Sequence, residues 1–258
     1  MKIVVLAKEV PDTYGNRELD LETGLAVRSA SEPVLDEIGG RAIEVALSHA
    51  DAHPGTEVVV ISMCPQSADA TVRRILAMGV HSAIHIVDEA LIGADLGLTA
   101  EVLASAARRA GFDLVIAGNL STDGTGGVLP AMVAEHLGVP HLTALSRVDV
   151  SDGTVSGTRE SDGGKLTLTA ELPAVISITD ALPGARLPSF KGLMAAKKKP
   201  YETVGMDVLG VDPGNFSVAR SIMTAVTQRP PRGPGVMIVD AEDAGERLAT
   251  FLADRGLA

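Results

Sequence analysis

The sequence predicts an α/β fold of three layers, in which helices cover both faces of a mostly parallel β-sheet. Two observations predict it. Strand-like and helix-like patterns alternate four times in the first 140 residues, as in parallel sheets with right-handed crossovers. The short apolar runs are rich in Val, Ile and Leu, which is typical of strands buried on both faces. An antiparallel β extension and a C-terminal arm are expected after these repeats.

The first half of the chain is predicted to hold four strands, each followed by a helix. Each strand is a short apolar run, and each helix has apolar residues three or four positions apart. In the first helix, Ile38, Ala42 and Ile43 share one face. The predicted strands are residues 2–7, 57–63, 82–87 and 113–117, and the predicted helices are 36–50, 66–78, 94–110 and one that ends near residue 137.

The second half changes from alternating strands and helices to successive β-like runs. Asp-Gly pairs separate the first three runs, and such pairs are typical of hairpin turns. The sequence therefore predicts an antiparallel extension of the sheet. The four runs are residues 142–150, 153–160, 165–171 and 174–179.

Two further stretches of the chain are expected to be irregular, and a small terminal unit follows them. Residues 181–200 are rich in Pro and Lys, and residues 226–235 have the composition of an extended linker. A last strand at 236–239 and a last helix at 241–254 cannot form a core alone, so they should dock on another chain. We therefore expect a domain over 1–225, including a partner-recognition loop at 183–200, followed by an arm over 226–258.

Composition and charge exclude several classes of protein. The formal net charge of −11 argues against a general nucleic-acid-binding protein, because phosphate backbones attract a surplus of Lys and Arg. The single cysteine, Cys64, excludes an intrachain disulfide and fits a reducing compartment. No apolar run approaches the length of a membrane span, and the chain starts without the layout of a signal peptide. We expect a cytoplasmic protein that neither binds nucleic acid nor inserts directly into a membrane.

The segment 118–130 gives the clearest indication of a ligand. It leaves the carboxyl end of the fourth strand and enters a helix, at the edge where parallel sheets bind ligands. Its glycines let a ligand approach the backbone, and the free amides of the helix start suit a phosphate. The alternative is a glycine-rich turn capped by Asp123 or Thr125. The segment is neither a Walker loop nor a dinucleotide fingerprint, and residues 8–12 after the first strand contain no glycine. Both observations argue against an ordinary NAD-dependent dehydrogenase.

No catalytic side chain and no metal site is predicted. His49 and His53 are four residues apart, but no third ligand lies near them. Cys64 has no partner cysteine and no nearby histidine, so we interpret it as a small packing residue.

Six segments, in order along the chain, match one family. They are residues 4–12, 36–38 with 42–46, 62–65 with 77–80, 121–130, 159–160 and 162–164 with 172–176, and 188–199. Together they resemble the β subunit of electron-transfer flavoproteins over nearly the whole chain. The resemblance implies a Rossmann-like fold of the adenine-nucleotide α-hydrolase type. It also implies a heterodimer with a larger α subunit, which would make most of the contacts to one redox-active FAD.

The same resemblance implies that the β subunit buries one structural AMP, with the phosphate near residues 124–128. By position in the family, the cofactor contacts are Leu6, Asp36, Glu37, Ile38, Gly39, Met63, Gly118, Asn119, Leu120, Ser121, Thr122, Asp123, Gly124, Thr125, Gly126, Gly127, Val128 and Leu129.

Further positions are implied to meet partners. Glu160 is a candidate for contact with the flavin side of the α subunit; the alternative is an ordinary surface charge on a hairpin. In the recognition loop, Phe190 or Leu193 would be the apolar anchor on an acidic dehydrogenase. Cations surround this anchor, and the alternative for the lysines is a solvated turn. They are Arg186, Lys197 and Lys198.

The family's activity would be electron transfer without catalysis by side chains. Primary flavin dehydrogenases, such as acyl-CoA dehydrogenases, would reduce the FAD, and a membrane quinone oxidoreductase would reoxidise it. Three alternatives stay open: a bifurcating variant with a second FAD in place of AMP, a universal-stress-type adenine-nucleotide sensor, and an ATP-using transferase. The sensor should lack the β extension and the tail beyond residue 200, and the transferase would require a phosphate loop near residue 10.

Overall fold

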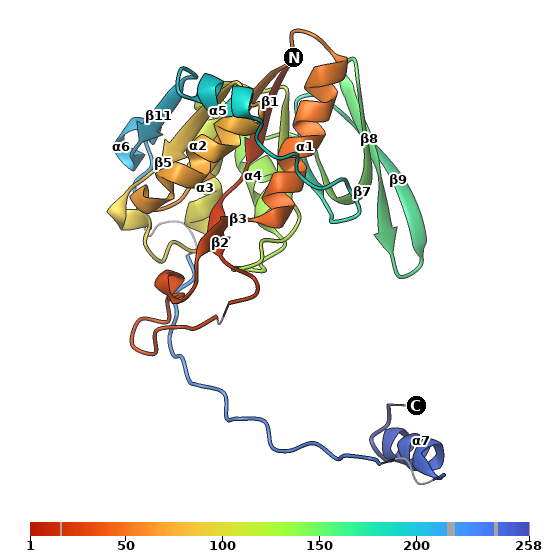
Figure 1. Cartoon of the computed structure of the whole chain (residues 1–258). Helices are drawn as coiled ribbons and strands as arrows, with labels where there is room; N and C mark the ends of the chain where they lie inside the picture. The colour runs from red at the N-terminus through yellow and green to blue at the C-terminus, as the bar shows by residue number, and fades with distance from the viewer. Residues whose placement is uncertain (16, 216–219, 240–241, 258) are drawn as a thin grey trace. The chain divides into compact units, whose positions relative to one another are not determined.

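The computed structural model describes residues 1–15, 17–215, 220–239 and 242–257. The chain divides into two compact units, Met1–Thr224 and Ala225–Ala258, which we call the core unit and the C-terminal unit. In the core unit, helices lie on both faces of a large, mostly parallel sheet (Figure 1). The predicted three-layer α/β fold class is therefore confirmed.

Within the described residues, nine strands form one sheet in the order β11-β5-β4-β1-β6-β10-β7-β8-β9. Neighbours from β11 to β7 are parallel, whereas β7, β8 and β9 pair antiparallel. In the register of the central strand β1, Val4 lies between Val59 and Val115. The strands are β1 (Lys2–Leu6), β4 (Glu57–Met63), β5 (Ser82–Ile86), β6 (Leu114–Gly118), β7 (His141–Ser151), β8 (Thr154–Ser161), β9 (Gly164–Glu171), β10 (Ala174–Ile178) and β11 (Tyr201–Val204).

Alternate side chains of β1 pack on opposite faces of the sheet. Ile3 and Val5 belong to the cluster that α1 and α2 cover, and Val4 and Leu6 belong to the cluster that α3 and α4 cover. Figure 1 shows these two pairs of helices on the two faces. The α-helices in the described residues of the core unit are α1 (Glu37–Ala52), α2 (Asp69–Met78), α3 (Leu96–Ala110), α4 (Leu129–Leu137), α5 (Phe190–Ala196) and α6 (Met206–Leu209).

One of the four β-like runs does not belong to the antiparallel extension. The run expected at 174–179 is β10, which lies between β6 and β7 and is parallel to both. All five residues of β10 are buried, as in a central parallel strand, whereas β9 at the edge of the sheet is mostly exposed. The extension therefore consists of β7, β8 and β9.

Several short elements lie outside the strands and helices that the sequence predicts. Within 181–200, α5 begins after Ser189, whose Oγ accepts a hydrogen bond from the Gly192 amide at 3.0 Å. The strand β11 then extends the sheet beside β5. In the loop after β1, β2 (Glu9–Pro11) and β3 (Pro33–Leu35) form a small antiparallel pair. These elements are too short for a hydrophobic period to reveal them.

The C-terminal unit differs from its prediction in one element. Residues 236–239 form no strand: Val236 and Met237 are exposed, and a strand without a neighbour leaves its backbone groups unpaired. The expected helix at 241–254 is α7 (Ala244–Asp254); residue 241 lies outside the described residues.

Helix α7 has no buried residue, although its sequence is amphipathic. Leu248 is half exposed, and the guanidinium of Arg255 lies 4.6 Å from the ring centre of Phe251. Over the described parts of the chain, no helix combines the length and the hydropathy needed to cross a bilayer.

Candidate functional site

The candidate site lies at the carboxyl ends of β1 and β6, two neighbouring strands after which the chain continues to opposite faces of the sheet. From β1 the chain continues to α1 on one face of the sheet, and from β6 it continues to α4 on the other face. Parallel sheets bind ligands at such a switch point, outside the carboxyl ends of the strands. Leu6 ends β1 and Gly118 ends β6, and Met63 ends the adjacent strand β4.

The start of α1 packs directly against both strand ends. A Cβ atom at Gly118 would lie 2.5 Å from Cγ2 of Ile38, so only glycine fits there. At Gly39 a Cβ atom would lie 3.4 Å from Cα of Ala7. The predicted residues of α1 are therefore brought to the predicted residues of β1 and β6, although about eighty residues separate Ile38 from Gly118 in the sequence.

The segment after β6 folds back onto the start of α1. The hydroxyl of Thr122 donates to Oδ1 of Asp36 at 3.1 Å. Asp36 is buried, and this burial raises the pKa of its carboxyl group, while the hydrogen bond from Thr122 opposes the rise. Arg17 also reaches this segment, because its guanidinium donates to the carbonyl oxygen of Thr122.

Asp123 is the centre of a charged cluster. Its carboxylate lies 2.6 Å from Nζ of Lys8 and 3.1 Å from Nη2 of Arg28. The backbone amide of Gly124 donates to Oδ1 at 2.6 Å. Burial by itself raises the pKa of Asp123, but the charge of Lys8 and the hydrogen bonds from Lys8, Ser121 and Gly124 outweigh burial and lower the pKa to about 2.

The backbone between Asp123 and α4 is sharply turned. Thr125 has a φ of 47° and its amide donates to the Ser121 carbonyl oxygen at 3.0 Å; Gly127 has a φ of 69°. Val128 stands at the N-cap of α4 and has no polar side-chain atom, so no side chain caps this helix. Apart from Pro130, which has no N–H, the first residues of α4 can therefore offer backbone amides to an external anion.

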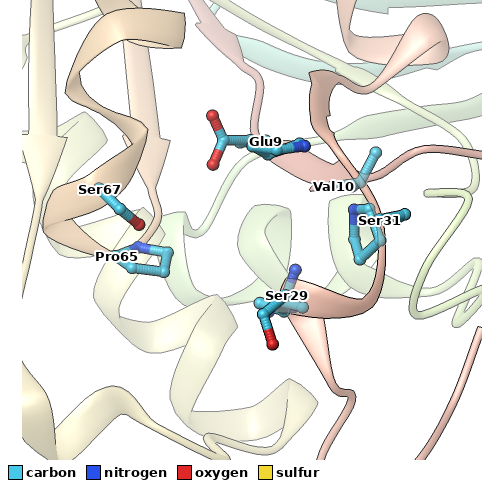
Figure 2. Close-up of a pocket in the computed structure, with 9 residues that line it drawn as sticks. Glu9, Val10, Ser29, Ser31, Pro65 and Ser67 are labelled. Atoms are coloured by element: carbon cyan, nitrogen blue, oxygen red, sulfur yellow. The ribbon is translucent and has the colours of Figure 1, made fainter.

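A pocket of about 420 Å³ lies beside this cluster (Figure 2). Figure 2 shows Pro65 and Ser67 on one side and Val10 and Ser31 on the other, with Glu9 between them. None of the predicted nucleotide contacts lines it. It shares Arg28 with the Asp123 cluster, and its lining residues are Glu9, Val10, Pro11, Arg28, Ser29, Ser31, Pro33, Pro65 and Ser67.

Cys64 is buried at the same edge of the sheet. The amide of Glu9 donates to its Sγ at 3.2 Å. Burial raises the pKa of the thiol above its ordinary value, so the group stays protonated at neutral pH.

Glu160 lies elsewhere in the sheet. It belongs to β8, which β10 and β7 separate from β6, and its carboxylate pairs with Lys165 of β9 at 2.9 Å. Both side chains of this pair are exposed. The structure therefore does not bring Glu160 to the switch point.

The predicted partner-recognition loop, residues 183–200, presents an apolar surface; we call it the recognition segment. Phe190 is 82% exposed, and Leu187, Leu193 and Met194 are exposed near it in sequence. Lys197 and Lys198 are exposed as well.

Arg186 instead ties the recognition segment to α1. Its guanidinium lies 2.8 Å from the carboxylate of Glu44 and 2.9 Å from that of Asp51. These two carboxylates raise the pKa of Arg186 above its ordinary value. Lys199 donates to the carbonyl oxygens of Leu76 and Val80. These two cations fix the segment in place rather than add free charge to its surface.

Sequence reasoning missed the three cations of the site. Lys8 directly follows a strand end, which is a local signal that could have identified it. Arg17 and Arg28 lie in the long loop after β1, and Arg28 is 95 residues from Asp123, so no local pattern indicated them.

We expect Asp123→Asn to lower the free energy of unfolding by about 1–2 kcal/mol at neutral pH. Because the folded pKa is depressed, the stabilisation is present above the ordinary pKa of 3.8 and is lost as pH falls towards about 2. Urea denaturation across this pH range measures it. Asp152→Asn in the exposed β7–β8 turn is the control. A difference that does not shrink in acid would contradict this electrostatic interpretation.

Comparison with known proteins is consistent with this geometry. The family described as "Electron transfer flavoprotein domain" matches residues 24–209. The "Electron transfer flavoprotein subunit beta" of Mycobacterium tuberculosis (strain ATCC 25618 / H37Rv) is 41% identical over 257 residues, 97% of each chain. The corresponding subunit of Mycobacterium leprae (strain TN) is also 41% identical over 257 residues, again 97% of each chain. The "Caffeyl-CoA reductase-Etf complex subunit CarD" of Acetobacterium woodii is 31% identical over 246 residues, 92% of each chain. The chain therefore belongs to the electron transfer flavoprotein family, among its β subunits.

Proposed function

We propose that the chain is the β subunit of a cytoplasmic heterodimer that carries electrons, and that it binds one structural AMP. The observation that carries the AMP proposal is the switch point between β1 and β6. There the glycine-rich segment leads into α4. The chain that contains it belongs to a flavoprotein family. The α subunit holds most of the contacts to one FAD, and this chain supplies part of the shell around it.

The charges and the backbone of the site support an adenylate. The chain has a net charge of −11, yet Lys8, Arg17 and Arg28 all contact the segment after β6. A phosphate is favoured by such cations and by amides at a helix start. Leu120 and Val128 are exposed beside these groups and offer apolar surface to a purine. We assign the AMP contacts to the predicted residues of β1, β4, α1 and the segment 118–129.

Redox chemistry in this proposal belongs to the flavin. The bound FAD accepts and releases electrons, and the chain's own side chains position partners without acting as catalysts. Glu160, exposed on β8, is proposed to orient a cation of the α subunit on the flavin side through a charge-assisted pair. It would exchange its present partner, Lys165, for that cation.

The exposed apolar face of α5 supports docking of an electron donor. Phe190 or Leu193 would fill an apolar depression on a primary dehydrogenase such as an acyl-CoA dehydrogenase. Lys197 and Lys198 would steer an acidic partner to this face. We propose a membrane quinone oxidoreductase as the acceptor of the electrons.

The division of the chain supports a separate role for its end. We propose that residues 1–225 are the nucleotide-binding domain and that residues 226–258 are an arm on the α subunit. Leu248 of α7 is half exposed, and no residue of this helix is buried. An amphipathic helix of this kind gains its stability by packing on a partner.

A second candidate is a bifurcating flavoprotein with FAD in place of AMP. The pocket of about 420 Å³ favours it, because the pocket shares Arg28 with the proposed phosphate site and could hold a larger ligand. The sensor and transferase alternatives have no such support, since the similarity to the Mycobacterium tuberculosis subunit covers 97% of the chain.

Purification of the native complex tests the proposal. We expect a yellow complex of two unequal subunits, and chromatography of its heat extract should give one FAD and one AMP per complex, because each cofactor has one site. Two FAD and no AMP would favour the second candidate. A colourless homodimer that hydrolyses ATP would contradict both.

Replacing the proposed anchor tests the docking face. We expect Phe190→Ala to slow reduction of the bound FAD by a dehydrogenase about tenfold, because a buried aromatic anchor carries much of the binding energy. The FAD absorption spectrum should not change. Leu166→Ala, at an exposed position on β9, is the control. Equal rates for parent and Phe190→Ala would remove Phe190 as the anchor.

A further inference from the structure

The carboxylate of Asp123 sits in a set of donors that suits an external anion. Lys8 and Arg28 contact its two oxygens, at 2.6 Å and 3.1 Å. The Gly124 amide donates to it at 2.6 Å. Two cations and a backbone amide from a glycine-rich turn are what proteins present to a phosphate. In this chain an internal carboxylate occupies that set.

The occupied donors remain accessible from solvent. The Asp123 side chain is only 9% exposed, whereas Lys8 is 35% and Arg28 is 47% exposed. Arg28 also lines the neighbouring pocket. An incoming anion can therefore reach both cations before Asp123 has moved.

Simple addition of a phosphate to this cluster is unfavourable. A phosphate dianion beside the Asp123 carboxylate would place like charges close together. A second carboxylate, that of Asp36 at the start of α1, lies against the same segment, because it accepts a hydrogen bond from Thr122. The Gly124 amide is also engaged already. An anion that uses Lys8, Arg28 and the Gly124 amide therefore has to replace the carboxylate.

We propose that Asp123 is an internal stand-in for the phosphate, and that an adenylate binds by exchange. The ligand's phosphate takes over Lys8, Arg28 and the Gly124 amide, and the Asp123 carboxylate turns out to solvent. The contact of Asp123 with AMP is then made by its backbone. This proposal rests on the proposed AMP site. Without a nucleotide, the Asp123 carboxylate then offsets part of the positive charge of Lys8 and Arg28. Binding then depends on the phosphate of the ligand rather than on its nucleoside.

Calorimetric titration of the nucleotide-free full chain with AMP and with adenosine tests the exchange. We expect Asp123→Asn to bind AMP about tenfold more tightly than the parent, because two charged contacts no longer have to be broken. Adenosine has no phosphate, so its affinity should be the same for both proteins. Asp152→Asn, with the same change of charge in an exposed turn, should match the parent for both ligands.

Each other result has a defined meaning. If the parent binds AMP and Asp123→Asn binds it equally or more weakly, the exchange is wrong and the AMP site stands. If neither protein binds AMP, the AMP site and the exchange both fail. Tighter binding of adenosine as well would show that the phosphate is not involved. Asp123→Ser, which also removes the charge, decides the matter if Asp123→Asn does not fold.

Discussion

The burial of strand β1 on both faces is the constraint on which the rest of the structure depends. Because Ile3 and Val5 pack under one helical layer and Val4 and Leu6 under the other, both faces of the sheet need helices. The chain leaves β1 and β6 towards opposite faces and so contributes a helix to each layer. The connections that follow these two strands therefore diverge. Gly118, at the end of β6, lets α1 approach β6 closely. The position of the candidate site follows from the packing of the core.

Cationic side chains set the electrostatic environment of the candidate site. In an acidic chain, three cations converge on a segment of two residues, Thr122 and Asp123. They come from the strand end and from the loop after β1, so the site depends on that loop as much as on the glycine-rich segment. On the proposed docking face, only some of the cations are exposed. There, Arg186 and Lys199 are held by the core unit, and the exposed Lys197 and Lys198 are left beside apolar residues.

The sequence predicted those features that depend on local pattern. The central strands and their helices were evident from apolar runs and helical spacing, and the resemblance indicated the family. The parallel position of β10 was missed, because order in a sheet depends on neighbours rather than on the strand itself. Helix α5 was missed because Pro and Lys dominate its surroundings, although Ser189 supplies a cap. Arg28 was missed because its partner is distant in sequence.

Amide hydrogen exchange tests most directly whether the switch point binds an adenylate. Exchange would be measured on the full chain, peptide by peptide, with and without AMP. If the site is correctly placed, AMP slows exchange in the start of α1 and in the segment 118–129, because ligand contacts suppress local opening there. Bound AMP that leaves these segments unchanged, while protecting amides elsewhere in the core unit, would contradict the placement.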